Sequence, residues 1–184
     1  MPVDQPTPAE RALLTVIEAR AEPGALSAVN VVLAQGRTFV PAAWPRGAPR
    51  RGLLGRCHPN ALRIARLTGF AYVEGYASVR GTTHPHAWCA GPDGAALDPT
   101  WPDGTATAYL GVPMTTAFVR AFQQRTLTKT VFVGVLDAEV QAVRDATRIF
   151  TGGVPDWGLL DIGRPQPTPA IGRRRELLER FGSL

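Results

Sequence analysis

Three short runs of aromatic and β-branched residues, separated by glycine-containing turns, constrain the fold of this chain more than any other feature. The runs are FAYVEGYASV, HPHAWCA and AALDPTW, and the segments RGTT and GPDG separate them. Short runs of this composition between tight turns are typical of antiparallel strands that follow one another in a meander. We therefore expect a small antiparallel sheet over residues 70–101.

Helical patterns precede this sheet. Thr7 and Glu10 form a T-x-x-E capping box around Pro8, which predicts a helix over about 8–21. SAVNVVLAQG predicts a second helix, and NALRIARLTG a third that starts at or near Cys57 and stops at Gly69. The segment PAAWPRGAPRRGLLG is too rich in proline and glycine for regular structure and is expected to be a surface loop.

Further elements are expected after the sheet. TTAFVRAFQQR and DAEVQAVRDATRIF have helical patterns, and KTVFVGVL between them reads as a strand. The chain then becomes irregular from Pro155 to Pro169, and RRRELLERFG predicts a short amphipathic helix. The order of elements indicates an α+β fold, with helices packed against a small antiparallel sheet.

Length and composition suit one domain. A chain of 184 residues can bury a core without disulfides, so we assign residues 1–184 to a single domain with its main body at about 25–150 and a tail with a basic helix at 155–184. No apolar run reaches the length of a membrane span, and MPVDQPTPAE lacks the features of a secretory signal. These observations predict a cytoplasmic protein that does not contact membranes.

The basic residues do not indicate nucleic-acid binding. The formal net charge is +5, but the arginines are mostly scattered and no aromatic residues are interleaved with the few clusters. Proteins that bind single-stranded nucleic acid combine a basic groove with aromatic stacking platforms. We therefore expect no nucleic-acid partner.

The chain has two cysteines, Cys57 and Cys89, too few for a disulfide framework. A cysteine accompanied by histidine and aspartate elsewhere in the chain is a candidate nucleophile, and a buried inert thiol is the alternative. Cys57 lies where a helix is expected to begin, and a helix N-terminus lowers the pKa of a thiol. Cys57 is thus the candidate nucleophile, and Cys89 is expected to be structural.

A histidine and an aspartate complete a candidate triad. Strand alternation places His84, His86 and Trp88 on one face of the second run, and Asp98 lies on the next strand across the turn. In this arrangement His86 would accept the proton of Cys57, and Asp98 would fix the tautomer of the imidazole.

These residues also carry a resemblance. A cysteine on a helix, then H-A-W on a strand, then an aspartate, in that order, is similar to the papain-like superfamily in its transglutaminase-like branch. The motifs C-x-x-N-A, Y-V-E-G-Y, H-A-W, L-D-P-T-W and Y-L-G-V-P resemble largely uncharacterised bacterial and phage proteins with this triad. The resemblance covers about residues 55–114 and implies a cysteine peptidase or related thiol hydrolase with a papain-like core.

Several polar residues are candidates for contacts beside the triad. The papain pattern has a glutamine just upstream of the cysteine that is absent here, which leaves Gln35, Asn30 and the Cys57 amide as possible oxyanion donors. Asn60 would cap or brace the loop, or touch substrate.

Two further side chains could face the site. Glu74 lies in an apolar strand, where a charge must be paired or at the rim, so we expect a salt bridge with Arg56 or Arg63, or a substrate contact. Trp101 would be a core residue or would wall the pocket.

A metal site is the main competing interpretation of the same residues. Cys57, His84, His86 and Asp98 could ligate zinc, because H-x-H on a strand can present two imidazoles to one metal. No second Cys–His pair at close spacing completes such a site, so we expect neither a metal nor another cofactor. His84 is then expected to line the cleft or face solvent.

The sequence thus predicts a cysteine-dependent hydrolase or acyl transferase. It would act on an amide or related acyl bond of a peptide, protein or small amide through a Cys57 thioester. Peptidase, deamidase and transglutaminase-like reactions share this intermediate. The alternatives are a non-catalytic binding protein that retains a degenerate triad and a Cys/His metal-binding protein.

Overall fold

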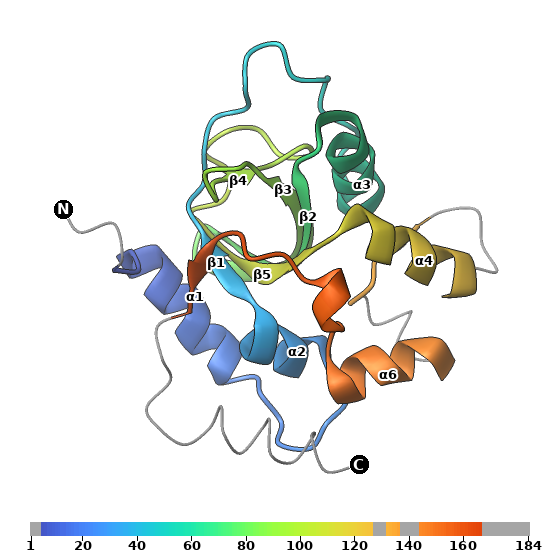
Figure 1. The fold of residues 1–184 in the computed structure, drawn as a ribbon. Coiled ribbons are helices and arrows are strands. Elements are labelled where there is room, and N and C mark those ends of the chain that lie inside the picture. The colour runs from blue at the N-terminus through green and yellow to red at the C-terminus, as the bar shows by residue number, and fades with distance from the viewer. Residues whose placement is uncertain (1–4, 127–131, 137–143, 167–184) are drawn as a thin grey trace.

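The computed structural model describes residues 5–126, 132–136 and 144–166, which form an α+β fold (Figure 1). Within these ranges five α-helices pack on a curled antiparallel sheet that resembles half of a barrel. A short 3-10 helix, Asp156–Gly158, follows the last of them. The α-helices are α1 (Pro8–Glu18), α2 (Ala28–Gln35), α3 (Cys57–Thr68), α4 (Thr116–Thr126) and α6 (Arg144–Gly152).

The sheet contains the predicted meander and extends beyond it. Its strands lie in the order β4-β3-β2-β5-β1-β6, and neighbours are antiparallel. The three predicted runs form β2, β3 and β4, which confirms that part of the prediction, although β4 has only two residues. The strands are β1 (Arg37–Phe39), β2 (Ala71–Val79), β3 (Thr82–Ala90), β4 (Ala96–Leu97), β5 (Ala108–Met114) and β6 (Arg164–Pro165).

Two opposed glycines allow the central strands to approach closely. Gly75 of β2 pairs with Gly111 of β5. A Cβ atom on Gly75 would lie 2.2 Å from the carbonyl oxygen of Leu110, and one on Gly111 would lie 2.5 Å from the Trp88 ring. Glycine inside a strand often marks such a close approach. The close approach of the two strands therefore requires glycine at both positions.

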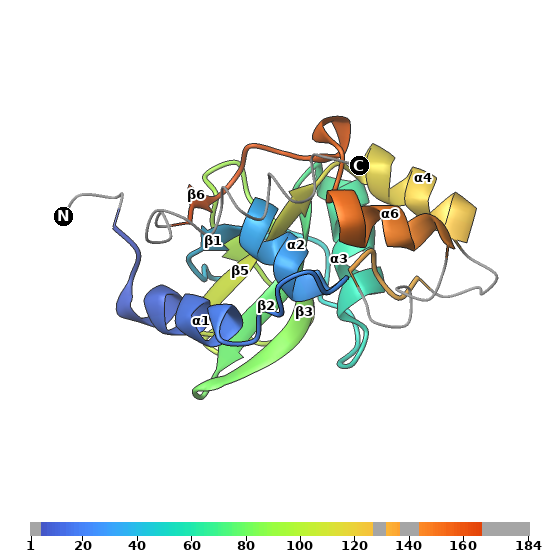
Figure 2. The same ribbon diagram turned by 90° about the horizontal axis from the view of Figure 1, so that it is seen from below.

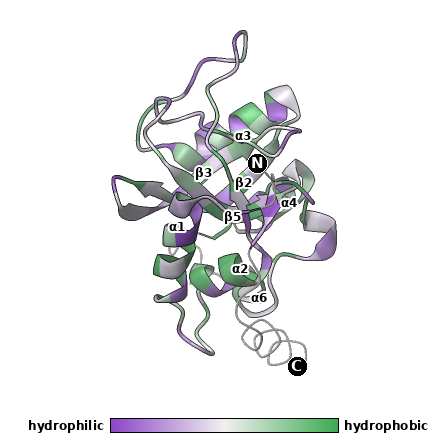
Figure 3. Ribbon diagram, turned by 90° about the vertical axis from the view of Figure 1, so that its left-hand side faces the viewer, coloured by the Kyte–Doolittle hydropathy of each residue, from purple (hydrophilic) through white to green (hydrophobic). Residues whose placement is uncertain are grey.

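Each face of the sheet has its own core. On one face α1, α2 and α3 bury Ile17, Val32 and Ile64 against Tyr72. Figure 2 shows α1 and α2 lying across β5 and β2, and Figure 3 shows that α2 is hydrophobic along most of its length. The other face, inside the curl, buries a smaller group of mainly aromatic and alanine residues, among them Phe39, Val73, Trp88 and Tyr109.

The structure corrects several predicted boundaries before and after the sheet. The first helix ends at Glu18 rather than at residue 21. The strands β1 and β5 were not predicted, and the tail before residue 167 contains a 3-10 turn and β6 instead of being wholly irregular.

The predicted strand KTVFVGVL is wrong for its described part, residues 132–136. The backbone N–H groups of Val135 and Leu136 donate to the carboxylate of Glu74, so this segment bonds to a side chain instead of joining the sheet. The first half of the helix predicted over DAEVQAVRDATRIF lies outside the described residues, and its second half lies in α6. The helix predicted over RRRELLERFG lies wholly outside them.

None of the helices in the described ranges is long and apolar enough to cross a bilayer.

Replacement of Gly75 by alanine tests the close approach of β2 and β5. The added methyl would meet backbone atoms that cannot move aside, so we expect the free energy of unfolding to fall by about 1–3 kcal/mol. Gly152→Ala is the matched control, because a Cβ there has no neighbour within 4 Å. Urea unfolding of both variants measures the difference, and equal stability of the two would contradict this account of the sheet.

Candidate functional site

Cys57 is the first residue of α3, as the sequence predicted. The preceding residue, Arg56, has a non-helical backbone and makes no side-chain capping hydrogen bond. The N–H groups of a first helical turn have no partner within the helix, and they form the positive end of its dipole. Pro59, two residues after Cys57, has no N–H to satisfy and suits this turn. The thiol therefore lies at a helix end that favours negative charge.

His86 is held rigidly on β3. Its ring is buried, with only 2% of the residue exposed, and it stacks on the indole of Trp101 with 3.6 Å between ring centroids. His86 and Trp88 share the inner face of the sheet, as alternation predicted. Trp101 thus covers one face of the imidazole, and it is not among the residues that line the cavity beside His86.

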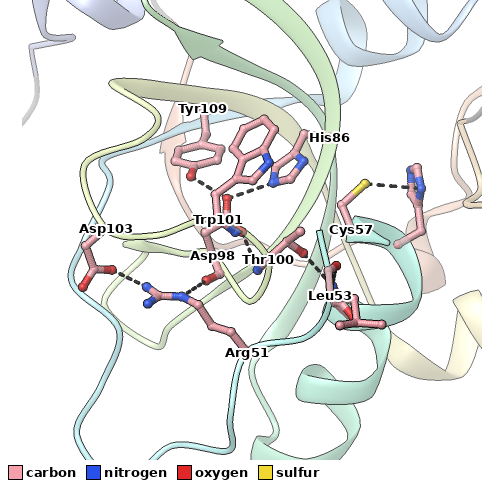
Figure 4. Close-up of polar contacts among 11 residues, drawn as sticks. Arg51, Leu53, Cys57, His86, Asp98, Thr100, Trp101, Asp103 and Tyr109 are labelled. Atoms are coloured by element: carbon pink, nitrogen blue, oxygen red, sulfur yellow. Dashed lines mark hydrogen bonds and ion pairs between the residues drawn. The ribbon is translucent and has the colours of Figure 1, made fainter. Parts of the chain in front are cut away.

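Asp98 accepts hydrogen bonds on both carboxylate oxygens (Figure 4). His86 Nε2 and the Tyr109 hydroxyl each donate to Oδ2 at 2.8 Å. The backbone N–H groups of Thr100 and Trp101 donate to Oδ1 at 2.8 and 2.9 Å. Asp98 lies directly after β4 rather than within the strand, and this turn position is what lets two backbone N–H groups reach it.

The pKa values of Asp98 and His86 shift in opposite directions. Burial opposes the charge on Asp98, but the hydrogen bond and charge of His86 and the backbone donors outweigh it and lower the pKa of the carboxyl. Burial would lower the pKa of His86, but its hydrogen bonds to Asp98 and Cys57 outweigh this and raise it. Because Asp98 can only accept, the Nε2 of His86 carries a proton, and Nδ1 is the nitrogen left for Cys57.

The Cys57 thiol is acidic. Burial would raise its pKa, yet hydrogen bonds and charges from His58 and His86 prevail and lower it to about 6. The Nδ1 of His58 lies 3.6 Å from Cys57 Sγ. At neutral pH such a group is mainly thiolate, the form that attacks carbonyl carbons.

Cys89 has the opposite properties. It is fully buried, its Sγ donates to the Ala61 carbonyl at 3.3 Å, and burial raises the pKa of its thiol far above the ordinary value. This environment fits the expected structural role.

The loop before Cys57 is fastened to the loop after Asp98. Asn60 Nδ2 donates to the Leu53 carbonyl and to Thr100 Oγ1, and Arg51 Nε donates to the Asp98 carbonyl (Figure 4). Arg51 also pairs with Asp103. These bonds fix the position of the helix N-terminus relative to the carboxylate. Asn60 is therefore a brace, one of the roles that the sequence left open.

Two predicted oxyanion donors lie elsewhere. The Gln35 amide exchanges two hydrogen bonds with the backbone of Val154. Asn30 Nδ2 donates to the carbonyls of Glu22 and Ala25 in the loop that precedes α2. Both amide groups thus hold loops in place, and the prediction of these residues as oxyanion donors is wrong. The backbone N–H of Cys57 is the candidate that remains.

His84 is exposed, and its Nε2 bonds to Thr82 Oγ1 at 2.8 Å. Its ring meets Trp101 edge-on with 6.3 Å between centroids. It therefore lies beyond Trp101, on the solvent side of the triad.

Glu74 has different partners from those expected. Its carboxylate accepts from the Tyr72 hydroxyl at 2.5 Å and from the backbone of Val135 and Leu136. Its remaining neighbour is His58, whose Nε2 lies 3.9 Å from Oε2. The predicted pairing with Arg56 or Arg63 is wrong, because Glu74 points to the face of the sheet on which His58 lies.

His58 was given no role from the sequence. The available signals were its position directly after the candidate nucleophile in the first turn of a helix, and an unexplained glutamate in the apolar strand YVEGY. Neither signal shows that His58 and Glu74 are neighbours, because 16 positions separate the two residues in the sequence.

A cavity of about 300 Å³ adjoins His58 and His86, and apolar side chains of α2 also line it. A second cavity, of about 430 Å³, lies beside Gln35 and Asp161 and includes none of the triad. The first cavity is lined in part by Ala28, Val29, Val32, His58, Glu74 and His86.

Within the described ranges no three or more histidine, cysteine, aspartate or glutamate side chains are grouped so that they could hold a metal ion.

Comparisons with protein-family models, with curated proteins and with solved structures give no match for this chain.

Replacement of Asn60 by alanine tests the brace between the two loops. It removes two hydrogen bonds and leaves the Leu53 carbonyl and Thr100 without this partner, so we expect a loss of about 1–3 kcal/mol of unfolding free energy. Arg63→Ala is the control on the same helix, since its bond to the Arg50 carbonyl is exposed, and a change within about 0.5 kcal/mol is expected. Similar losses in both variants would refute the brace.

Proposed function

We propose that this protein is a cysteine-dependent hydrolase or acyl transferase whose triad is Cys57, His86 and Asp98. The observation that carries the proposal is the acidic thiol of Cys57 at the start of α3, beside an imidazole whose far nitrogen is bonded to a buried carboxylate. The chain order of the triad, and a helix that packs against an antiparallel sheet, are also consistent with a papain-like or transglutaminase-like core.

The first half of the reaction forms a thioester. The Cys57 thiolate attacks the carbonyl carbon of an amide or ester, and the C–S bond forms as negative charge develops on the carbonyl oxygen. The His86 imidazolium then gives its proton to the leaving nitrogen or oxygen as that bond breaks. Asp98 supports the charge of the imidazolium and keeps the proton of Nε2 in place.

The second half releases the acyl group. A water molecule attacks the thioester carbonyl and loses a proton to the neutral His86, and the C–S bond breaks to give a carboxylic acid and Cys57. An amine in place of water gives a new amide, which is the transglutaminase-like outcome. In this proposal the backbone N–H of Cys57, at the start of α3, would donate to the developing oxyanion.

A non-catalytic scaffold is the second candidate, but the two cysteines favour the enzyme. If Cys57 were only a core thiol, burial without compensation would raise its pKa, as it does for Cys89. Instead the pKa of Cys57 is lowered by two adjacent imidazoles.

Alkylation by iodoacetamide should distinguish the two thiols. We expect the rate at Cys57 to rise with pH through a midpoint near 6, because the thiolate is present above its lowered pKa, while Cys89 in the folded protein stays unreactive. Peptide mass spectrometry after timed quenching gives both rates. Equal, slow labelling of the two cysteines would reject the enzyme in favour of the scaffold.

Acyl transfer is tested in the same way with p-nitrophenyl acetate. The expected product is an acetyl group on Cys57, seen by mass spectrometry and missing from the Cys57→Ala protein. Cys89→Ala is the matched control and should be acetylated like the parent.

The two histidines of the H-x-H segment should differ in effect. His86→Ala is expected to slow alkylation of Cys57 at pH 5 by roughly tenfold or more, because the thiol pKa rises from about 6 by a unit or more without the imidazolium, and below its pKa the thiolate fraction falls about tenfold for each unit. His84→Ala should leave the rate within about twofold, since His84 lies on the solvent side of Trp101. Circular dichroism confirms that both variants are folded, and the reverse ranking would show that His86 is not the base.

A further inference from the structure

Glu74 is a buried carboxylate that the triad does not use. Only 1% of the residue is exposed. Its carboxylate accepts hydrogen bonds from the Tyr72 hydroxyl and from the backbone N–H groups of Val135 and Leu136. A buried charge is costly unless donors surround it. The three donors come from β2 and from a segment about 60 residues further along the chain, so the protein builds a dedicated site for this carboxylate.

His58 lies between this carboxylate and the nucleophile. Its Nδ1 is 3.6 Å from Cys57 Sγ, and its Nε2 is 3.9 Å from Glu74 Oε2. Phe132 packs edge-on against the ring, with 6.5 Å between centroids. Gly134 covers both partners, because a Cβ atom there would lie 2.7 Å from His58 Cδ2 and 2.9 Å from Glu74 Oε2. The orientation of the ring is thus constrained from several sides.

We propose that His58 is a second base for Cys57 and that Glu74 is its positioning residue. The order thiol, imidazole, carboxylate repeats that of Cys57, His86 and Asp98. Glu74 faces the α-helical side of the sheet, while His86 and Asp98 belong to the inner side, so the two pairs approach the thiol from different faces. This inference rests on the proposed function, since it assigns a second acceptor to the same nucleophile.

The proton balance requires no further reactant. The S–H bond of Cys57 breaks, and its proton passes to Nδ1 of His58, which becomes an imidazolium. Nδ1 can accept only if Nε2 already carries the other proton, and a carboxylate beside Nε2 favours that tautomer. In the described part of the chain, the ionisable groups around this centre include Tyr72, Glu74, His86, Cys89 and Asp98.

The test compares single and double replacements of the two histidines. We expect His58→Gln and His86→Gln each to slow iodoacetamide alkylation of Cys57 at pH 6.5 by about threefold, because each raises the thiol pKa from about 6 by about one unit and so lowers the thiolate fraction at this pH. The double variant should be slower than either single variant. At pH 9.5 all four proteins should react alike, since the thiolate forms without help; this shows that access to Cys57 is unchanged.

The results separate this inference from the proposed function. If His58→Gln matches the parent at pH 6.5 while His86→Gln is slow, the second base is overturned and the triad stands. If the parent itself titrates like an ordinary thiol and is not acetylated by p-nitrophenyl acetate, the proposed function fails as well.

The role of Glu74 is tested by Glu74→Gln, which keeps the shape of the side chain and removes its charge. Alkylation at pH 6.5 should slow by a few-fold, with no change at pH 9.5. If that variant does not fold, ¹⁵N shifts of the His58 ring in the Cys57→Ala protein provide the readout. A proton on Nε2 supports the assignment, and a proton on Nδ1 overturns it.

Discussion

The hydrogen bonds to the buried Asp98 carboxylate hold the candidate site together. A carboxylate in this position is tolerable only because an imidazole, a phenol and two backbone N–H groups donate to it at 2.8–2.9 Å. Those donors come from β3, from β5 and from the turn after β4. One ionised group therefore fixes the relative positions of three segments, and the His86 ring inherits its orientation from them.

The nucleophile reaches this centre from outside the sheet. The long proline-rich loop ends at Cys57, and on its own it would leave the start of α3 poorly defined. Asn60 and Arg51 tie it to the segment after Asp98, and the backbone N–H of Gly52 donates to the Pro99 carbonyl. A Cβ atom at Gly52 would overlap the Asn60 amide, so the brace also needs a glycine there. Precise placement of a thiol thus depends on ordinary polar contacts made by a loop.

The sequence predicted those elements whose determining residues lie close together in the chain. The capping box at Thr7 and the helix that begins at Cys57 were visible because their signals lie within a few residues. The meander and the pairing of His86 with Asp98 follow from alternation and short turns. The partners of Glu74, Gln35 and Asn30 were missed because each bonds to backbone groups, which carry no signature in the sequence. The stretch after residue 131 was misread as a strand for the same reason, since its N–H groups bond to a side chain.

Glu74 and Gly75 are neighbours on β2 and act on opposite faces of the sheet. Neighbouring residues of a strand face opposite sides, so β2 presents a carboxylate towards His58 at one position and, at the next, a glycine that pairs with His86 on β3 and with Gly111 on β5. The glycine allows the sheet to curl tightly around the aromatic group that holds His86, and the glutamate meets α3 on the other face. YVEGY, a short motif with no ionisable group besides the glutamate and its tyrosines, thereby shapes both sides of the thiol. A side chain at position 75 would collide with the backbone of Leu110 and Gly111, whereas a neutral one at position 74 would change the charge beside His58, so substitutions at these two neighbouring positions act on opposite faces of the sheet.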